Sequence, residues 1–202
     1  MLEVRNARKA DLDNVIELEN KVWPPGTRSS REKFESRLKI FPEGFFLAYD
    51  NENLIGVSTS QIIKYDGSTI ESWERITDYG FIRTHNSKGN ALYVVSIGAI
   101  SRSGGGSALI QAQKELVTKL NLDFLVLGSR IPGYNSYCNE QEEVSIEEYV
   151  QLKRENGEIL DPELRFYTRN GLSLKEIKAN YMEDDKESRN YGAIMLWIPS
   201  RI

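Results

Sequence analysis

Short apolar runs alternate along this chain with segments in which apolar residues recur every three or four positions. The short runs predict strands, and they lie at residues 2–5, 44–50, 54–65, 91–100, 123–131, 172–182 and 191–198. The longer recurrence predicts amphipathic helices, and these lie at residues 11–23, 29–41, 107–120, 145–156 and 162–169. Residues 66–90 are less regular, with one or two helical turns expected at 70–79. A mixed α/β fold follows from this order.

Residues that favour helix starts stand where the helical pattern begins. Ser29 with Glu32 and Ser145 with Glu148 match the capping box. Asp161 is followed by Pro162, a combination typical of an N-cap and the first helical position. Between the strand at 123–131 and the helix at 145–156 we expect a polar connection over residues 134–144.

A glycine-rich loop interrupts the centre of the chain. The uncharged run at residues 91–100 leads directly into Ser101-Arg102-Ser103-Gly104-Gly105-Gly106-Ser107 and then into the helix at 107–120. Bare backbone N–H groups at a helix start bind anions, and Arg102 adds a positive charge that suits phosphate. Neither the Lys-Ser/Thr of nucleoside-triphosphatase loops nor the G-x-G-x-x-G of dinucleotide folds is present. The loop predicts a phosphate site, with a mobile hinge as the alternative.

The order of elements also predicts topology. The strand at 91–100, the helix at 107–120 and the strand at 123–131 form a βαβ crossover, whose strands run parallel. Ligands of such units bind at the carboxyl ends of the strands. The short turn Asn51-Glu52-Asn53 joins the runs at 44–50 and 54–65 as an antiparallel hairpin.

Composition excludes several classes of protein. A chain of 202 residues with 40% apolar and 28% charged residues fits one globular domain over residues 1–202. No apolar run is long enough to span a membrane, and the N-terminus is too polar for a signal peptide, so we expect a cytoplasmic protein without a membrane partner. One cysteine, Cys138, and one histidine, His85, leave no metal-ligand cluster. The net charge of −4 disfavours nucleic acid as a partner.

Two segments resemble motifs of the GCN5-related N-acetyltransferases (GNAT family). The glycine loop resembles the R/Q-x-x-G-x-G/A motif that follows the fourth strand of this family and holds the pyrophosphate of acetyl-CoA. If Gly104 and Gly106 are the motif's glycines, Ser101 occupies the Arg/Gln position; if Arg102 occupies it, the glycines become Gly105 and Ser107. The segment FYTRNGL at residues 166–172 resembles the F/L-Y-x-x-x-G-F segment of the family's last helix and sixth strand. Together with the strand pattern, the resemblance covers nearly the whole chain.

The resemblance implies a mixed, largely antiparallel sheet of six to seven strands with a central parallel βαβ unit and helices on both faces. It implies an acyltransferase that moves an acetyl group directly from acetyl-CoA, its co-substrate, to an amine of a small acceptor, without a metal. The residues implied to hold acetyl-CoA are Ile97, Gly98, Ala99, Arg102, Ser103, Gly104, Gly105, Gly106 and Ser107. A backbone N–H of the first three would bind the oxyanion or the pantetheine. Tyr167 matches the family's acid, which protonates the leaving thiolate; the alternative is an aromatic packed in the core.

Other segments, GSRIPGYNSY and NYMEDD, resemble acetyltransferase domains that are sometimes joined to a nitrilase-like carbon–nitrogen hydrolase. These 202 residues contain no hydrolase part.

The acceptor side of the site stays open. Arg130 and Tyr134 follow the strand at 123–131, where substrate is expected, and Arg130 suits an anionic group of the acceptor. Its alternative role is an ion pair with one of the carboxylates in the following connection, Glu140, Glu142 or Glu143. The central strand carries no carboxylate or histidine, so the candidates for a general base are a water molecule or the polar residues before that strand, Glu71, Glu74, Asp78 and His85. Cys138 has no basic neighbour in sequence and is expected to be a bystander.

Two other functions fit the same residues. One is a non-catalytic acyl-CoA-binding or regulatory domain on the same fold, and the other is an unrelated α/β binding protein. Turnover of acetyl-CoA distinguishes the enzyme from the non-catalytic binding domain. Affinity for CoA distinguishes both of these from the unrelated α/β binding protein. The residues do not identify the acceptor, and they are compatible with a homodimer.

Overall fold

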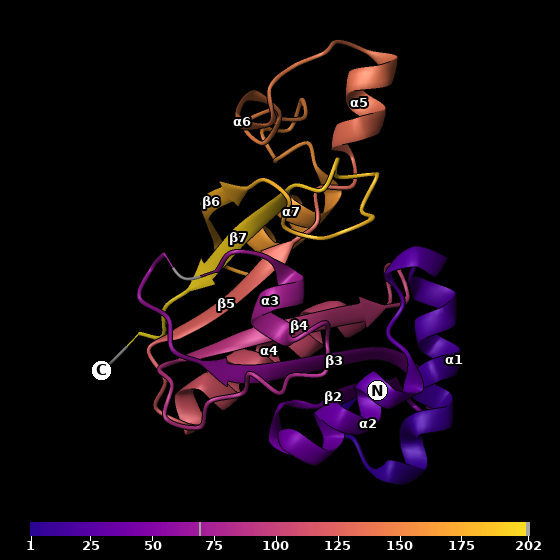
Figure 1. The fold of residues 1–202 in the computed structure, drawn as a ribbon. Helices are drawn as coiled ribbons and strands as arrows, with labels where there is room; N and C mark the ends of the chain where they lie inside the picture. The colour runs from indigo at the N-terminus through magenta and orange to yellow at the C-terminus, as the bar shows by residue number, and fades with distance from the viewer. Residues whose placement is uncertain (69, 201–202) are drawn as a thin grey trace. The chain divides into compact units, whose positions relative to one another are not determined.

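The computed structural model describes residues 1–68 and 70–200 and divides into two compact units. Of the described residues, the first contains Met1–Leu125 and residues 198–200, and the second contains Val126–Trp197. Along the sheet the strand order is β1-β2-β3-β4-β5-β7-β6 (Figure 1). Strand β5, Phe124–Ser129, begins in the first unit and continues in the second. The expectation of a single domain over residues 1–202 stays a prediction.

The first unit contains an antiparallel meander and its covering helices. Its strands are β1 (Leu2–Asn6), β2 (Phe46–Asp50), β3 (Asn53–Ile63) and β4 (Ala91–Ala99), and each pairs antiparallel with the next. Its helices are α1 (Leu12–Val22), α2 (Arg31–Ile40), α3 (Trp73–Thr77) and α4 (Gly105–Lys119). Short 3-10 turns occur at Lys9–Asp11, Pro25–Thr27 and Pro42–Gly44.

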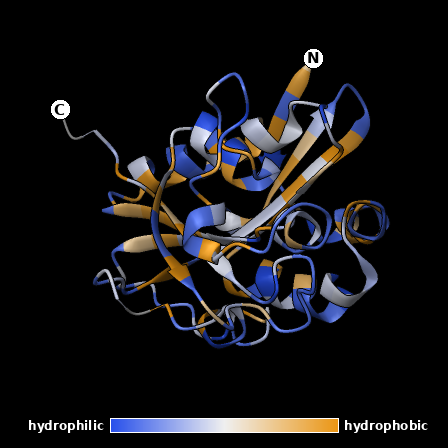
Figure 2. Ribbon diagram, turned by 90° about the horizontal axis from the view of Figure 1, so that it is seen from above, coloured by the Kyte–Doolittle hydropathy of each residue, from blue (hydrophilic) through white to orange (hydrophobic). Residues whose placement is uncertain are grey.

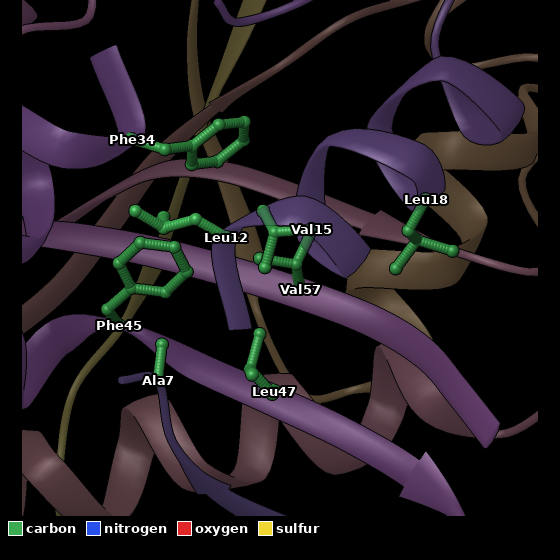
Figure 3. Packing of buried hydrophobic residues seen from close by; sticks show 8 residues of the cluster. All are labelled: Ala7, Leu12, Val15, Leu18, Phe34, Phe45, Leu47 and Val57. Atoms are coloured by element: carbon green, nitrogen blue, oxygen red, sulfur yellow. The ribbon is translucent and has the colours of Figure 1, made fainter. Parts of the chain in front are cut away.

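Two hydrophobic clusters cover the two faces of these strands. One gathers the apolar face of α1, a residue of α2 and the strands β2 and β3 (Figure 3), and it consists of Ala7, Leu12, Val15, Leu18, Phe34, Phe45, Leu47 and Val57. The other joins Ala48 and Ile55 to Leu109 of α4. In Figure 2 orange is concentrated on the strands, while the loops are mostly blue. Burial of the apolar stripe of each helix against the sheet is the main stabilising contribution, and it places helices on both faces.

The second unit contains the end of the sheet and three short helices. The helices are α5 (Tyr134–Glu140), α6 (Ile146–Tyr149) and α7 (Pro162–Arg169), and the strands β6 (Ser173–Lys178) and β7 (Gly192–Trp197) pair antiparallel. Asp161 caps α7 as predicted, because its carboxylate accepts the N–H groups of Glu163 and Leu164 at 3.0 and 3.1 Å.

The predicted fold class is confirmed: the sheet has seven strands, is mostly antiparallel, contains one parallel pair and carries helices. Three local predictions are wrong. The connection at 134–144 contains helix α5, and the helix expected over 145–156 ends at Tyr149, after which Lys153 pairs with Ile159 across a turn. The N-cap of α2 is Ser30 rather than Ser29, because Ser29 is engaged elsewhere, as described below.

Candidate functional site

Strand β4 contains a bulge near its middle. Thr59 of β3 pairs with Ser96, but the next residue of β3, Ser60, pairs with Val94, so Val95 has no partner in register. The carbonyl of Val95 accepts a hydrogen bond from the indole Nε1 of Trp73 at 2.9 Å. A bulge kinks a strand and redirects the residues that follow it, and the residues that follow Val95 in β4 are Ser96, Ile97, Gly98 and Ala99.

Beyond the bulge, β4 presents different residues to its two faces. Ile97 packs with Ala48, Ile55 and Leu109 on the α4 face. Gly98 faces α1: a Cβ there would lie 2.7 Å from Nε1 of Trp23 and 2.9 Å from Cγ2 of Val22. These distances are shorter than van der Waals contact, so the absence of a side chain at Gly98 allows the end of α1 to approach β4.

The glycine loop forms a tight turn into α4. Arg102 and Gly104 both adopt left-handed backbone angles, with φ values of 60° and 79°. Ser103 fixes the turn, since its Oγ donates to the carbonyl of Ile100 at 2.7 Å and accepts the N–H of Gly105 at 3.2 Å. Helix α4 therefore begins at Gly105, two residues before the predicted start at 107.

The first turn of α4 carries the amides that matter for an anion. The N–H of Ala108 donates to the carbonyl of Gly104 at 3.1 Å, so the N–H groups of Gly106 and Ser107 precede the intrahelical ladder. Ser107 and Arg102 are exposed and Gly106 is half-buried, whereas Gly105 is buried. Arg102 has no ion pair within residues 1–68 and 70–200. The loop residues predicted to hold acetyl-CoA thus lie together in the first unit, at the end of β4.

Tyr167 lies on α7 in the second unit. Its side chain is 9% exposed, and its ring contacts that of Phe166 edge to face at 5.1 Å between centroids. Glu163 lies one helical turn earlier, and its Oε2 accepts from Ser129 Oγ at 3.5 Å. Burial raises the pKa of Glu163 to about 8. Burial and then the charge of Glu163 raise the pKa of Tyr167, so the phenol stays protonated at neutral pH.

Arg130 and Tyr134 are both engaged within the second unit. The guanidinium of Arg130 binds Asp185 through Nε at 3.0 Å and Nη2 at 2.6 Å, and Nη2 also binds Glu187 at 2.5 Å. The predicted alternative partners of Arg130, namely Glu140, Glu142 or Glu143, are wrong. Among the described residues Arg130 forms its ion pairs with Asp185 and Glu187, and Glu143 pairs with Arg189 instead. Tyr134 is 4% exposed, and its hydroxyl donates to the carbonyl of Val144 at 2.9 Å. A role in acceptor binding stays a prediction for both.

The candidate bases before β4 each have a structural contact. Glu71 pairs with Arg75, and Asp78 pairs with Arg83, both at the surface. His85 accepts the N–H of Ile62 at Nδ1, 3.1 Å away, and burial lowers its pKa. Glu74 is buried on α3, where its charge acts on Lys33. Cys138 is buried, and no three or more His, Cys, Asp or Glu side chains of the described residues form a metal-binding group.

The sequence analysis missed a buried charged network beneath β4. Arg37 of α2 is 1% exposed and donates to the carbonyl of Gly80 and to the hydroxyls of Ser29, Thr59 and Ser96. Glu19 of α1 is 2% exposed and accepts the N–H of Ser29 at 2.8 Å. A signal for it exists in the sequence. Glu19 lies four residues after Val15 and Arg37 three after Phe34, so both charges occupy positions on the apolar faces of their helices.

Comparison with known proteins places these features in context. No protein-family model matches the chain. The chain is 36% identical over 204 residues to the uncharacterized N-acetyltransferase YkwB of Bacillus subtilis, covering 97% of this chain and 88% of that protein. It is 35% identical over 198 residues to the probable hydrolase YhcX of the same organism, covering 96% of this chain but only 38% of that protein.

Solved structures with the same fold include two GNAT-like proteins. The loading GNATL domain of CurA from Lyngbya majuscula superposes with a TM-score of 0.84 at 19% identity, covering 98% of each chain. The GphF GNAT-like decarboxylase in complex with isobutyryl-CoA gives 0.80 at 22% identity, covering 97% of this chain and 98% of that one. Within the described residues no helix is long and apolar enough to cross a membrane.

Proposed function

The chain belongs to the GCN5-related N-acetyltransferase family, and from that premise we propose that it transfers an acetyl group from acetyl-CoA directly to the amine of a small acceptor. Acyltransferase activity follows from the family itself. That the group is acetyl and that the acceptor is an amine are proposed here. The main support is the unit formed by the bulged strand β4, the glycine loop and helix α4.

The glycine loop binds the pyrophosphate of acetyl-CoA in this proposal. The N–H groups of Gly106 and Ser107 and the positive end of the α4 dipole attract phosphate oxygens. Arg102 adds an exposed guanidinium, whose two N–H donors can bind one phosphate group together. Ser103 and Gly104 also shape the turn, since Ser103 Oγ engages Ile100 and Gly105 and Gly104 has a positive φ. The GphF structure, which holds isobutyryl-CoA, is consistent with acyl-CoA as a ligand of this fold.

The reaction needs few further groups. A backbone N–H of Ile97, Gly98 or Ala99 stabilises the oxyanion that develops on the thioester carbonyl. The bulge at Val95 supports this assignment, because it changes the direction of the N–H groups that follow. Tyr167 donates its proton to the departing CoA sulfur, and its raised pKa keeps that proton in place until the thiolate forms.

Acetyl-CoA turnover against a panel of primary amines tests the proposal. Release of free CoA thiol that depends on both acetyl-CoA and an amine, with the acetylated amine identified by mass spectrometry, is the expected result. Malonyl-CoA is tested beside acetyl-CoA because one structure of the same fold is named a malonyl-CoA decarboxylase. Loss of carbon dioxide without an acceptor would replace acetyl transfer with decarboxylation. Acetyl-CoA binding by calorimetry without any turnover would favour the non-catalytic binding domain.

A further inference from the structure

A third carboxylate of the second unit lies beside an ion-pair cluster that is already complete. Arg130 binds Asp185 through two nitrogens and Glu187 through one, and Asp185 is buried. Glu163 of α7 lies close enough for the charge of Arg130 to act on it. It forms no ion pair, however, in residues 1–68 and 70–200. Two carboxylates therefore already neutralise this guanidinium before Glu163 is counted.

The hydrogen-bond geometry at Glu163 fits a carboxylic acid. Ser129 Oγ lies 2.7 Å from the carbonyl oxygen of Arg130 and 3.5 Å from Oε2 of Glu163. A hydroxyl has one hydrogen to donate and can also accept, and the shorter contact is the better hydrogen bond. When Ser129 donates to the carbonyl, its oxygen is still able to accept, so the contact with Glu163 is best satisfied when Glu163 carries the hydrogen.

The electrostatic surroundings of Glu163 also favour its protonated form. Glu163 is half-buried. Burial raises its pKa to about 8, while the charge of Arg130 lowers it and the charges of Asp161 and Asp185 raise it. A carboxylate near other carboxylates holds its proton more tightly for the same reason. Glu163 is therefore mostly a neutral acid at neutral pH.

Other groups near Glu163 do not reverse this preference. The positive end of α7 is already occupied by Asp161, whose carboxylate accepts the N–H groups of Glu163 and Leu164. The charged and titratable groups of this region come from the end of β5, the connection between β6 and β7, and α7 itself, and they are Arg130, Asp185, Glu187, Tyr181, Asp161 and Tyr167.

Glu163 lies one helical turn before Tyr167 on α7. Residues four apart on a helix are neighbours, with Cβ atoms about 5–6 Å apart. Burial and then the charge of Glu163 raise the pKa of the Tyr167 phenol. The proton of Tyr167 therefore leaves more readily when Glu163 is neutral, because the phenolate does not then form beside a second negative charge.

We propose that Glu163 controls the reaction through Tyr167: as a neutral carboxylic acid it allows the phenol to give its proton to the CoA sulfur, and as a carboxylate it hinders that transfer. This inference rests on the proposed function and deepens it. Glu163 is a positioning residue in this scheme, because it touches neither acetyl-CoA nor the acceptor. Its ionisation sets the alkaline limit of the reaction.

Glu163 keeps its proton throughout the reaction. The neutral amine attacks the thioester carbonyl carbon, the C–S bond breaks, and Tyr167 gives its proton to sulfur. The attacking nitrogen loses one proton to solvent, and the Tyr167 phenolate takes one proton from solvent. The net products are the acetylated amine and CoA thiol, so atoms and protons balance without any change at Glu163.

The test compares the single-turnover rate of acetyl transfer in the wild type and in Glu163→Gln, with an acceptor found in the amine panel. Gln has the shape of a protonated Glu and does not ionise, so both proteins should react equally fast at about pH 6. Above about pH 8 the wild type should become slower than the variant by roughly 3- to 30-fold, the effect of a unit charge one helical turn from the phenol. The ratio of the two rates removes the pH dependence of the amine, which both proteins share.

Glu155→Gln is the matched control. Glu155 is exposed in the connection before α7, so the loss of its charge should leave the ratio to the wild-type rate the same at every pH. A ratio for Glu163→Gln that does not change with pH would overturn the inference, whether that variant is as fast as the wild type or uniformly slower. Wild-type single-turnover rates in Tyr167→Phe would overturn it too, because Glu163 would then have no acid to act on.

Infrared spectroscopy measures the proton on Glu163 without any substrate. A carboxylic acid has a C=O stretch that an ionised carboxylate lacks, so the difference spectrum between the wild type and Glu163→Gln should show this band at neutral pH. The band should disappear with a midpoint at about pH 8. Absence of the band at neutral pH would overturn the inference while leaving acetyl transfer intact. Absence of transfer to every amine, with the band present, would instead refute the proposed function and the inference that rests on it.

Discussion

Replacing Gly98 by alanine tests whether α1 must approach β4 closely for this site to form. The new Cβ would lie 2.7 Å from Nε1 of Trp23 and 2.9 Å from Cγ2 of Val22. Atoms of this kind pack at about 3.5 Å or more, so the end of α1 has to shift by roughly 0.8 Å. The two clashing atoms belong to two different side chains, the ring of Trp23 and the β-branched Val22, so rotating one side chain does not relieve both contacts.

The expected magnitude follows from overpacking in a close-packed interior. Inserting a carbon atom that the surroundings must accommodate costs about 1–3 kcal/mol. For a chain of this size each kcal/mol lowers Tm by about 2–4 °C, so Gly98→Ala should lower Tm by about 2–12 °C. In urea the midpoint should fall with the slope unchanged, because the native fold is kept.

Gly26→Ala is the matched control. Gly26 lies in the exposed connection between α1 and α2, its φ is not positive, and a Cβ there would meet no atom within 4 Å. The same chemical change should leave the free energy of unfolding within about 0.5 kcal/mol of the wild type. If Gly98→Ala unfolds at the same midpoint as Gly26→Ala, the close approach of α1 to β4 is refuted.

The remaining predictions concern single side chains. Gly106→Val should weaken acetyl-CoA binding at least tenfold, about 1.4 kcal/mol, as measured by calorimetry. Gly105→Val should weaken it too and should also destabilise the fold, because a Cβ at Gly105 would already lie 3.1 Å from Ile55. Unchanged affinity in both variants would refute the phosphate site. Tyr167→Phe should lower kcat by roughly 10²-fold or more with little change in acetyl-CoA affinity, whereas wild-type turnover would leave Tyr167 as a packing residue. Arg130→Lys loses the two-point contact with Asp185 and should lower Tm and all activities together; a selective loss of kcat/KM for anionic amines would restore the acceptor role. Because the pKa of Glu19 is raised in the folded chain, its ionisation opposes folding, so the stability of the wild type relative to Glu19→Gln should fall as pH rises above about 4.5, and urea midpoints that track each other at every pH would contradict that direction.

Local signals were sufficient for most of the fold. Each predicted strand is present, although β6 covers only Ser173–Lys178 of the predicted residues 172–182. The hairpin turn Asn51-Glu52 has the left-handed residue, Asn51, that a tight turn requires. Helix α7 is delimited by Asp161 at its start as predicted. Such features depend on residues within one turn of one another, so the sequence alone contains the information.

Predictions failed where a residue has partners far away in sequence. Ser29 and Ser30 are equally good helix caps by composition, and Ser29 with Glu32 matches the capping box. The chain uses Ser30, because Ser29 bridges Glu19, ten residues earlier, and Arg37, eight residues later. The partner of Arg130 was misplaced for the same reason: Asp185 lies 55 residues away, beyond the carboxylates that follow Arg130 directly.

Contacts between residues far apart in sequence also distinguish the buried Arg130 from the buried pair Glu19 and Arg37. Arg130 has two carboxylate partners, and removing either side of such a pair leaves a buried charge uncompensated, which explains its presence without any ligand. Glu19 and Arg37 share no ion pair in the residues that the structure describes and are bridged by Ser29, and one oxygen of Glu19 has no hydrogen-bond partner there. An apolar pair at these two helix positions would pack against β4 at lower cost. Violations of local rules of this kind are expected at functional sites. This one reaches β4 through the bond from Arg37 to Ser96, the residue before the three backbone positions, Ile97 to Ala99, at which the thioester is proposed to react.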